Sequence, residues 1–394
     1  MKPELLAPAG DLEKVKIALL YGADAVYIGG TKFSLRARAS NFSLVSIKEA
    51  VDFAHSIQKK IYVTTNIVPH NSDLLDLDQY LLDLERCQVD AIICSSPYII
   101  DRAKTLTHLN IHLSTQLSVT NSLLSNYWYN YGISRIVLAR ELSLEEIKTI
   151  SHNTLSELEV FIHGGMCVSY SGKCTLSNYM SNRDANRGGC AHSCRWKYDL
   201  YHLDTKISED FDFQMSSKDL ETLAFIPTLM DLGISSLKIE GRMKSIHYIA
   251  TVVSTYRMLI DDYDLRQIKP ISFYENEIKK AENRLTSFGF MKGITTPLQQ
   301  LYNMRSEEPT KEFVGIVLSY NQETKQAMIE QRNYFKPQDI LEVLSPTQIP
   351  IQFQVGDLYS EDGLLLDAAR HPLQIILFQS DLDLKPYDLI RKVF

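Results

Sequence analysis

Four of the six cysteines lie close together in the sequence, and their side chains are well suited to bind a metal. Cys167, Cys174, Cys190 and Cys194 fall within 28 residues, with six, fifteen and three residues between successive members. The stretch around them is rich in Gly, Ser, Asn and Arg, so packing in a hydrophobic core does not explain these thiols. Structural zinc sites usually pair ligands roughly two to four residues apart, whereas iron–sulfur clusters tolerate wider gaps. The spacing favours a cluster, and a zinc site or redox-active or unligated thiols remain alternatives.

The other two cysteines have different neighbours. Cys87 and Cys94 lie in apolar runs, where a thiol behaves as a small buried hydrophobe. Disulfides are rare in a reducing compartment. The N-terminus lacks the apolar stretch of a signal peptide, and no run approaches the roughly 18 apolar residues of a membrane span. We therefore expect a cytoplasmic protein without a membrane anchor.

Several polar side chains follow predicted strands and are candidates for chemistry. His163 precedes the first clustered cysteine and is a candidate for proton transfer, with a structural histidine as the alternative. Glu240 is a candidate acid or base, and Arg242 is a candidate clamp for a carboxylate or phosphate. A mutual ion pair or support of a loop would explain the last two equally well.

A second set of strand-end residues is suited to binding a substrate. Arg36 and Arg38 follow the second predicted strand, where they could receive a dicarboxylate, although adjacent loop arginines are often only solvated. Asn66 and Gln116 could orient a substrate amide or hydroxyl, or could act as buried polar caps.

The cysteine segment also carries a local positive charge. The chain as a whole has a formal net charge of -7, which argues against a generally basic nucleic-acid binder. Between positions 167 and 198, however, there are five basic residues and one acidic residue. Aromatic side chains are interleaved with them, a combination suited to phosphate contact and base stacking. The basic residues include two candidate RNA contacts, Arg187 and Arg195; a merely solvated loop is the alternative.

The elements that must position these residues follow a repeating pattern. The chain has 394 residues, 45% of them apolar and 23% charged, which is typical of globular proteins rather than disordered or fibrous ones. Apolar runs alternate with helical patterns at the spacing of βα units, which favours a (β/α)8 TIM-like barrel over a doubly wound open sheet. Nine strands are candidates, one of them serving the insertion or an edge: 4–8, 25–29, 61–65, 91–94, 111–116, 135–140, 158–163, 213–216 and 237–241. Asp11 is a predicted helix cap, and Ser143 with Glu146 a predicted capping box.

The pattern also divides the chain. We predict a barrel over residues 1–262, with the cysteine-bearing insertion at about 164–212 leaving the carboxyl end of a strand, the catalytic face of barrels. A helical connector over 263–309 follows, with a charged helical pattern from 275 to 285. Short alternating segments separated by turn residues then predict a small β-barrel domain over 310–394.

Several motifs resemble those of a known family. The run EVFIHGGMCVSYSGKCTLS at 159–177 resembles the signature of the collagenase-like peptidase U32 family, with Gly165 where the signature has Ser or Ala. The resemblance extends to PELLAPAG at 3–10, GADAVYIGG at 22–30 and LKIEGR at 237–242. It therefore covers the predicted barrel, and the C-terminal domain resembles one appended in many members.

The resemblance implies a chemistry that composition does not show. Characterised members act largely as oxygen-independent hydroxylases with a four-iron four-sulfur cluster (4Fe-4S), which places the cluster ligands on Cys167, Cys174, Cys190 and Cys194. The run NRGGCAHSCRW at 186–196 most resembles the branch that forms 5-hydroxyuridine at the tRNA wobble position in a prephenate-dependent reaction. The expected partners are tRNA and prephenate, with a homo-oligomer or a hetero-oligomer with a paralogue also open.

Other functions remain open on the sequence alone. They are hydroxylation of ribosomal RNA or of a ubiquinone precursor, a peptidase or collagenase, and a non-catalytic RNA-binding scaffold. The peptidase function has little support from the residues, because the chain contains no His-Glu-x-x-His helix and no Gly-x-Ser-x-Gly elbow.

Overall fold

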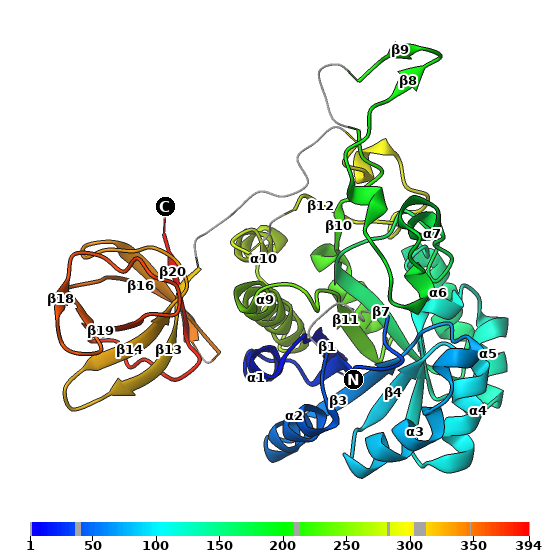
Figure 1. Ribbon diagram of the computed structural model, residues 1–394, viewed down its shortest axis with the longest axis horizontal. Coiled ribbons are helices and arrows are strands. Elements are labelled where there is room, and N and C mark those ends of the chain that lie inside the picture. The colour runs from blue at the N-terminus through cyan, green and yellow to red at the C-terminus, as the bar shows by residue number, and fades with distance from the viewer. Residues whose placement is uncertain are drawn as a thin grey trace.

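The computed structural model describes residues 2–35, 41–208, 213–281, 284–302, 313–346 and 348–393. Its larger part is a barrel of parallel strands surrounded by helices, and its smaller part is an antiparallel sheet (Figure 1). In the described part of the chain, no helix combines the length and the apolar character needed to cross a membrane.

Eight parallel strands form the barrel. Each is a short, largely buried run of apolar residues, as expected for strands covered on both faces. Neighbours in the sequence pair in order, and the last strand pairs with both the first and the seventh, which closes the ring. The strands are β1 (Glu4–Pro8), β2 (Ala25–Gly29), β3 (Lys60–Thr65), β4 (Ala91–Cys94), β5 (Asn110–Leu113), β6 (Arg135–Val137), β7 (Glu157–Gly164) and β11 (Ser236–Ile239). The predicted barrel is confirmed, and the open sheet is excluded.

Two of the helices outside the barrel begin at the side-chain caps that the sequence predicts. Asp11 Oδ1 accepts a hydrogen bond from the backbone N–H of Lys14 at 2.9 Å, and Ser143 and Glu146 form a reciprocal capping box. The apolar faces of the helices pack against the outward side chains of the strands. They are α1 (Leu12–Leu20), α2 (Leu44–Ser56), α3 (Leu77–Arg86), α4 (Pro97–Leu106), α5 (Ser122–Asn130), α6 (Leu144–Asn153), α8 (Ile226–Asp231) and α9 (Ile246–Asp264).

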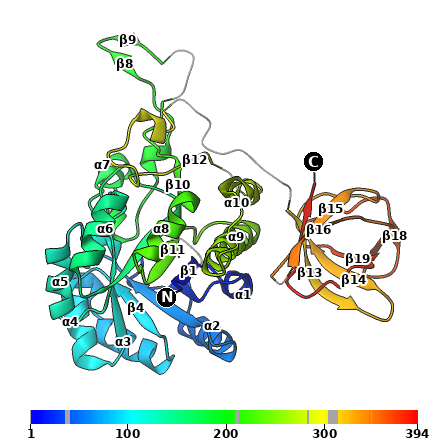
Figure 2. The same ribbon diagram turned by 180° about the vertical axis from the view of Figure 1, so that it is seen from behind.

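The insertion follows β7 and contains little regular structure. The longest pieces are α7 (Leu176–Ser181), two single 3₁₀ turns, η3 (Ala185–Arg187) and η4 (Ser193–Arg195), and a hairpin of β8 (Tyr201–His202) and β9 (Thr205–Lys206). The hairpin projects from the carboxyl-end face of the barrel, as Figures 1 and 2 both show.

The strand predicted at 213–216 does not form. Phe213 makes an isolated bridge to Tyr198, and the chain enters the sheet later as β10 (Asp219–Glu221), which runs antiparallel to the end of β7. The 213–216 candidate therefore belongs to the insertion, as was expected for one of the nine candidates. Phe213 packs on a distant segment instead, since its ring stacks on Tyr302 with centroids 5.5 Å apart.

The connector contains less helix than its charged pattern predicts. Among the described residues of this region the α-helix is α10 (Ile271–Ile278), which begins before the predicted 275–285 segment and ends within it. Farther along, β12 (Thr286–Ser287) pairs with β10, and a 3₁₀ turn, η6, covers Pro297–Gln299. Pairing with β10 competes with continuation of the helix, which a charge pattern alone does not reveal.

The C-terminal part is an all-β domain, as predicted. Its strands form one antiparallel sheet that curls around its own core of buried aliphatic and aromatic residues (Figure 1). They are β13 (Phe313–Asn321), β14 (Gln326–Gln331), β15 (Ile340–Ser345), β16 (Gln348–Gln354), β17 (Leu358–Ser360), β18 (Leu365–Leu366), β19 (Ile375–Gln379) and β20 (Leu389–Lys392).

Candidate active site

A cavity of about 220 Å³ lies between the carboxyl ends of the barrel strands and the insertion. The strand ends and the loops that follow them form one wall, and the cysteine-bearing segment forms the other. All four clustered cysteines line it, as do six other residues predicted or found at strand ends: Asn66, Gln116, Arg140, Lys238, Glu240 and Arg242. The sequence-predicted catalytic face is therefore the face that carries the cavity.

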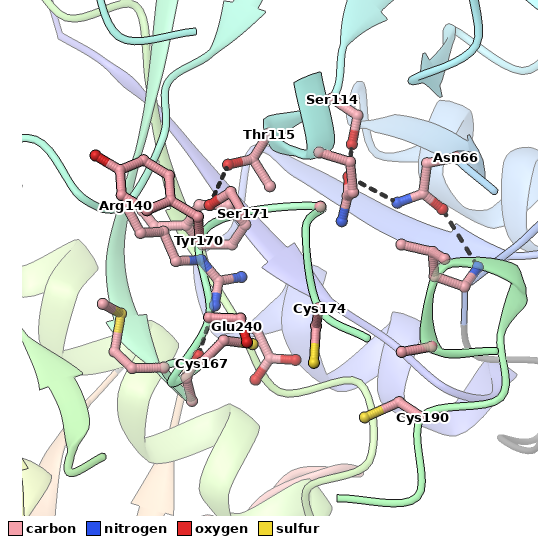
Figure 3. A pocket seen from close by; sticks show the side chains of 18 of the residues that line it. Asn66, Ser114, Thr115, Arg140, Cys167, Tyr170, Ser171, Cys174, Cys190 and Glu240 are labelled. Carbon is pink, nitrogen blue, oxygen red and sulfur yellow. Dashed lines mark hydrogen bonds between the residues drawn. The ribbon is translucent and has the colours of Figure 1, made fainter. Parts of the chain in front are cut away.

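The four thiols surround a shared space rather than separate pockets. Figure 3 shows the sulfur atoms of Cys174 and Cys190 turned toward the same region, with Cys167 and Glu240 nearby. Burial, reinforced by nearby Cys167, Cys190 and Cys174, raises the pKa of Cys194 to about 11. Four mutually repelling thiolates in one cavity are stable only with positive charge between them, so the donor set fits a cationic metal group.

The spacing of the donors bears on which group fits. Within the described ranges, no three His, Cys, Asp or Glu side chains approach closely enough to hold a single metal ion. In a four-iron cluster each of the four thiolates binds a different iron, so the ligands surround a larger body. The arrangement around the cavity is compatible with that larger body.

The first half of the cysteine segment is held against the strand ends by close backbone contacts. Gly172 has φ +72°, and an added Cβ would lie 2.2 Å from the carbonyl oxygen of Gln116. Only glycine permits both this conformation and this approach. Beside it, the backbone N–H of Ser171 donates to Glu141 Oε1 at 2.8 Å, and Arg140 Nη1 donates to the carbonyl of Gly165 at 2.6 Å.

The second half is attached to the loop that follows β3. Asn186 Nδ2 donates to the carbonyl oxygen of Cys174 at 3.0 Å, and the backbone N–H of Val68 donates to the carbonyl of Asn186 at 2.9 Å. Arg187 makes a bidentate ion pair with Asp73, at 2.9 and 2.7 Å, and the guanidinium lowers the pKa of that carboxyl. Arg187 does not line the cavity and holds the insertion to this loop; its contact with RNA stays a prediction.

His163 is likewise directed away from the cavity. The register between β7 and β11 shifts between Phe161 and His163, and the imidazole packs between Tyr248 and Tyr256 of α9. Burial lowers the pKa of His163 to about 3, so the ring is neutral at physiological pH. The expectation that this side chain reaches the substrate is therefore corrected. Its backbone carbonyl still helps to position Glu240 by accepting that residue's N–H at 2.8 Å.

Glu240 and Arg242 both line the cavity but have different surroundings. The Glu240 carboxylate is partly exposed and lies over the backbone of Gly165. Arg242 is buried, and its guanidinium donates to Ser34 Oγ at 3.0 Å and to Asn41 Oδ1 at 3.2 Å. Arg242 thus binds two residues between β2 and α2, Ser34 and Asn41, while presenting positive charge to the cavity.

The remaining predicted residues divide into three groups. Asn66 and Gln116 are brought together, with Asn66 Nδ2 donating to Gln116 Oε1 at 3.3 Å. Arg195 lines the cavity, and an added Cβ at Gly165 would lie 3.4 Å from its Nη2. Arg36 and Arg38 lie outside the described residues.

Lys238 and Arg140 also line the cavity and were not among the predicted site residues. Lys238 is buried on β11 and donates to Glu159 Oε1 at 2.6 Å, and burial lowers its pKa. Its Nζ lies 4.7 Å from the ring centroid of Tyr27. The signal that could have identified it was an ionisable residue at an inward position of a barrel strand, two residues before Glu240.

The fold and the site define a class of protein: a closed (β/α)8 barrel whose catalytic face is covered by a four-cysteine insertion. Residues 10–300 match peptidase family U32, and residues 309–391 match the C-terminal domain of peptidase family U32. The chain belongs to the peptidase U32 family, which confirms the resemblance that the motifs indicated.

Three curated relatives show the range of the family. The chain is 46% identical to "tRNA hydroxylation protein P1" of Bacillus subtilis, over 99% of this chain and 95% of that protein. It is 39% identical to the "23S rRNA 5-hydroxycytidine C2501 synthase" of Escherichia coli, over 66% of this chain and 39% of that protein. It is 33% identical to a "Collagenase" of Porphyromonas gingivalis, over 66% of each.

Proposed function

We propose that this chain is a tRNA-modifying hydroxylase that forms 5-hydroxyuridine at the wobble position. The observation that carries the proposal is the meeting of Cys167, Cys174, Cys190 and Cys194 around one cavity at the catalytic face. Similarity over nearly the whole chain to a protein named for tRNA hydroxylation supports the same reaction class. A peptidase would instead need an activated nucleophile or a metal-bound water, and the sequence contains neither a His-Glu-x-x-His zinc motif nor a Gly-x-Ser-x-Gly elbow.

The four cysteines would hold a 4Fe-4S cluster. When bound, such a cluster supplies a redox-active centre whose potential depends on charge, hydrogen bonds and exposure. The chain's own residues set those conditions. Arg195 is adjacent to Cys194 and lowers the pKa of its thiol, against the larger effect of burial, and so favours the thiolate. Glu240 lies at the same cavity and is the candidate group to accept or return a proton.

The insertion provides the surface for tRNA. Tyr179 and Trp196 are exposed to 87% and 40%, respectively, and Tyr170 on the same segment lines the cavity. Planar side chains of this kind stack on unpaired bases, and Lys173 and Arg183 are placed on the same segment for phosphate contact. A wobble base must leave its stack to enter the cavity, as other base-modifying enzymes require.

A small dicarboxylate such as prephenate is the proposed required co-substrate. The cavity is lined by four cationic side chains and two carboxylates: Arg140, Arg195, Lys238 and Arg242 against Glu141 and Glu240. Glu141 is also engaged by Ser171. The cationic excess suits an anionic small molecule.

Nucleoside analysis of tRNA tests the proposal. A strain lacking this gene and any paralogue should lose 5-hydroxyuridine and nucleosides derived from it. The wild-type gene should restore them, and a Cys190→Ala gene should not. Undiminished 5-hydroxyuridine in the deletion strain would overturn the proposal, and loss of a hydroxylated ribosomal nucleoside instead would reassign the substrate.

A further inference from the structure

A chain of amide hydrogen bonds runs along one wall of the cavity, and its direction is fixed at one end by the backbone. The N–H of Leu35 lies 3.3 Å from Asn66 Oδ1, and a backbone N–H can only donate. The oxygen of the Asn66 amide must therefore face Leu35. Its nitrogen then faces Gln116 and donates to Oε1 at 3.3 Å.

The same logic fixes the orientation of Gln116. Its Oε1 accepts from Asn66 Nδ2 and also from the hydroxyl of Ser114, which uses both acceptor positions of an amide oxygen. The Nε2 group is the part of the Gln116 amide left for a ligand, and Gln116 lines the cavity. Among the described residues, Nε2 has no hydrogen-bond partner. The wall consequently offers a donor at this point and selects an acceptor oxygen.

Gln116 also lies close to the proposed reaction centre. The backbone carbonyl oxygen of Gln116 lies against Gly172, which precedes Cys174 by two residues. The ring atom hydroxylated in 5-hydroxyuridine, C5, is bonded to C4, so the base edge turned toward the cysteines also carries the substituent on C4. In uracil that substituent is a carbonyl oxygen, which accepts hydrogen bonds, and in cytosine it is an amino group, which donates them.

We propose that Gln116 Nε2 reads the C4 carbonyl of the target uracil, and that Asn66 is a positioning residue that holds the Gln116 amide in the donor orientation. This assignment rests on the proposed function and specifies which pyrimidine the site accepts. With cytosine, the C4 amino group and Gln116 Nε2 would face each other as two donors, and neither would have an acceptor inside the cavity. The free-energy cost of two unsatisfied donors corresponds to a preference of about 10-fold to 100-fold for uridine.

Two near-isosteric substitutions test the direction of the amide chain. Gln116→Glu replaces the donor with an acceptor oxygen. Asn66→Asp should act through Gln116, because one carboxylate oxygen still accepts from Leu35 and the other takes Nε2–H, which turns Gln116 Oε1 toward the cavity. Ser114→Ala is the matched control, since it removes one hydrogen bond to Oε1 without reversing the amide.

The substrates are two anticodon stem-loop RNAs that differ only in having uridine or cytidine at the wobble position. Affinity is measured by fluorescence anisotropy, and hydroxylation by mass spectrometry of nucleosides. The wild-type protein and Ser114→Ala should favour uridine in both measurements. Gln116→Glu and Asn66→Asp should each lower the uridine-to-cytidine ratio at least 10-fold, with unchanged iron content as evidence that the site is intact.

The outcomes separate this inference from the function on which it rests. Failure of the wild-type protein to hydroxylate either RNA would overturn both. Hydroxylation of uridine by the wild-type protein, with the base ratio unchanged in Gln116→Glu and Asn66→Asp, would overturn only the inference. An unchanged ratio accompanied by a higher requirement for prephenate would overturn it too, because Gln116 would then bind the acid rather than the base.

Discussion

At the scale of single residues, the six cysteines occupy two environments with different chemistry. Cys87 and Cys94 are buried in the hydrophobic core, where burial raises the pKa of Cys94 to about 11 and keeps it a neutral thiol. Cys167 is exposed at the cavity, and the other three are partly buried. Thiols within reach of one another and of solvent can exchange protons for metal, whereas isolated core thiols cannot.

This contrast predicts which cysteine changes remove iron. Cys174→Ala should lose most of the iron and acid-labile sulfide, together with the broad visible absorbance of a thiolate-held cluster, because one of four ligands is absent. Anaerobic purification followed by metal and sulfide analysis measures the loss. Cys87→Ala is the matched control and should keep about four irons per chain. Iron loss in the control instead would show that the ligands are assigned wrongly.

His163 makes a separate prediction about pH. Its pKa falls from 6.5 to about 3 on folding because it is buried, so the unfolded state binds a proton that the folded state does not. Stability is therefore lost as pH falls below about 6.5, with a slope that approaches 1.4 kcal/mol per pH unit from this group. His163→Phe should make the decline in unfolding free energy between about pH 6.5 and pH 5 shallower, as measured by urea denaturation.

The same variant tests whether His163 has a role in chemistry. The imidazole does not line the cavity, so His163→Phe should retain iron and RNA affinity near wild-type values. An unaltered pH slope with abolished hydroxylation would restore the catalytic role that the sequence indicated.

At the scale of elements, the cysteine loop depends on its contact with the turn after β5. Gly172→Ala should place Cβ against the Gln116 carbonyl and displace the loop, in addition to a cost of about 1 kcal/mol for positive φ. Gly363→Ala is a matched control, because Gly363 has φ +79° and open space where the Cβ would lie. Both variants should lose comparable backbone stability, and only Gly172→Ala should lose iron. Equal iron content in the two variants would contradict this role of the contact.

The strands and helices could be predicted from the sequence where the local pattern of apolar and capping residues determines them. The eight barrel strands are buried runs at regular spacing, and the caps at Asp11 and Ser143 use hydrogen bonds within one helical turn. The strand expected at 213–216 was not predictable in this way, because its apolar residues pack on a segment far along the chain.

The residues of the candidate site likewise divide into those that local pattern could predict and those that depend on distant parts of the chain. The sequence indicated that Asn66, Gln116 and Glu240 meet, because the carboxyl ends of parallel strands converge. It could not indicate that Arg187 pairs with Asp73, 114 residues away, or that a register shift turns His163 toward α9. Both depend on tertiary neighbours. From the sequence alone, an arginine next to clustered cysteines is equally compatible with binding the substrate and with holding the insertion in place.

At the scale of the whole molecule, the two domains are joined by buried polar contacts. The hydroxyl of Tyr21 on α1 donates to the carbonyl of Leu344 at 2.7 Å. Arg391 of β20 is almost completely buried, and it pairs with Glu342 of β15 at 2.5 Å and with Glu277 of α10 at 3.2 Å. Burial raises the pKa of Glu342, but Arg391 and Lys280 outweigh that effect and hold it below its usual range.

Arg391 is therefore the most deeply buried of the cations in these ion pairs. Arg391→Met should leave the Glu277 and Glu342 carboxylates near each other with only Lys280 between them, at a cost of about 3–5 kcal/mol. Because the lost Arg391–Glu277 pair joins α10 to the sheet, we expect calorimetry to show a separate, lower-temperature transition for the C-terminal domain. Adding Glu342→Gln should recover part of the loss, because it removes one of the two carboxylates that would otherwise share Lys280.

An exposed pair within the same domain provides the control. Arg370 pairs with Asp367 at 2.7 Å, and both side chains are largely solvent-exposed. Arg370→Met should change stability by less than about 1 kcal/mol and leave the transitions as in the wild-type protein. If Arg391→Met also unfolds without a new transition and with similar stability, the domains are held together by their apolar contacts, and the buried ion pairs contribute little.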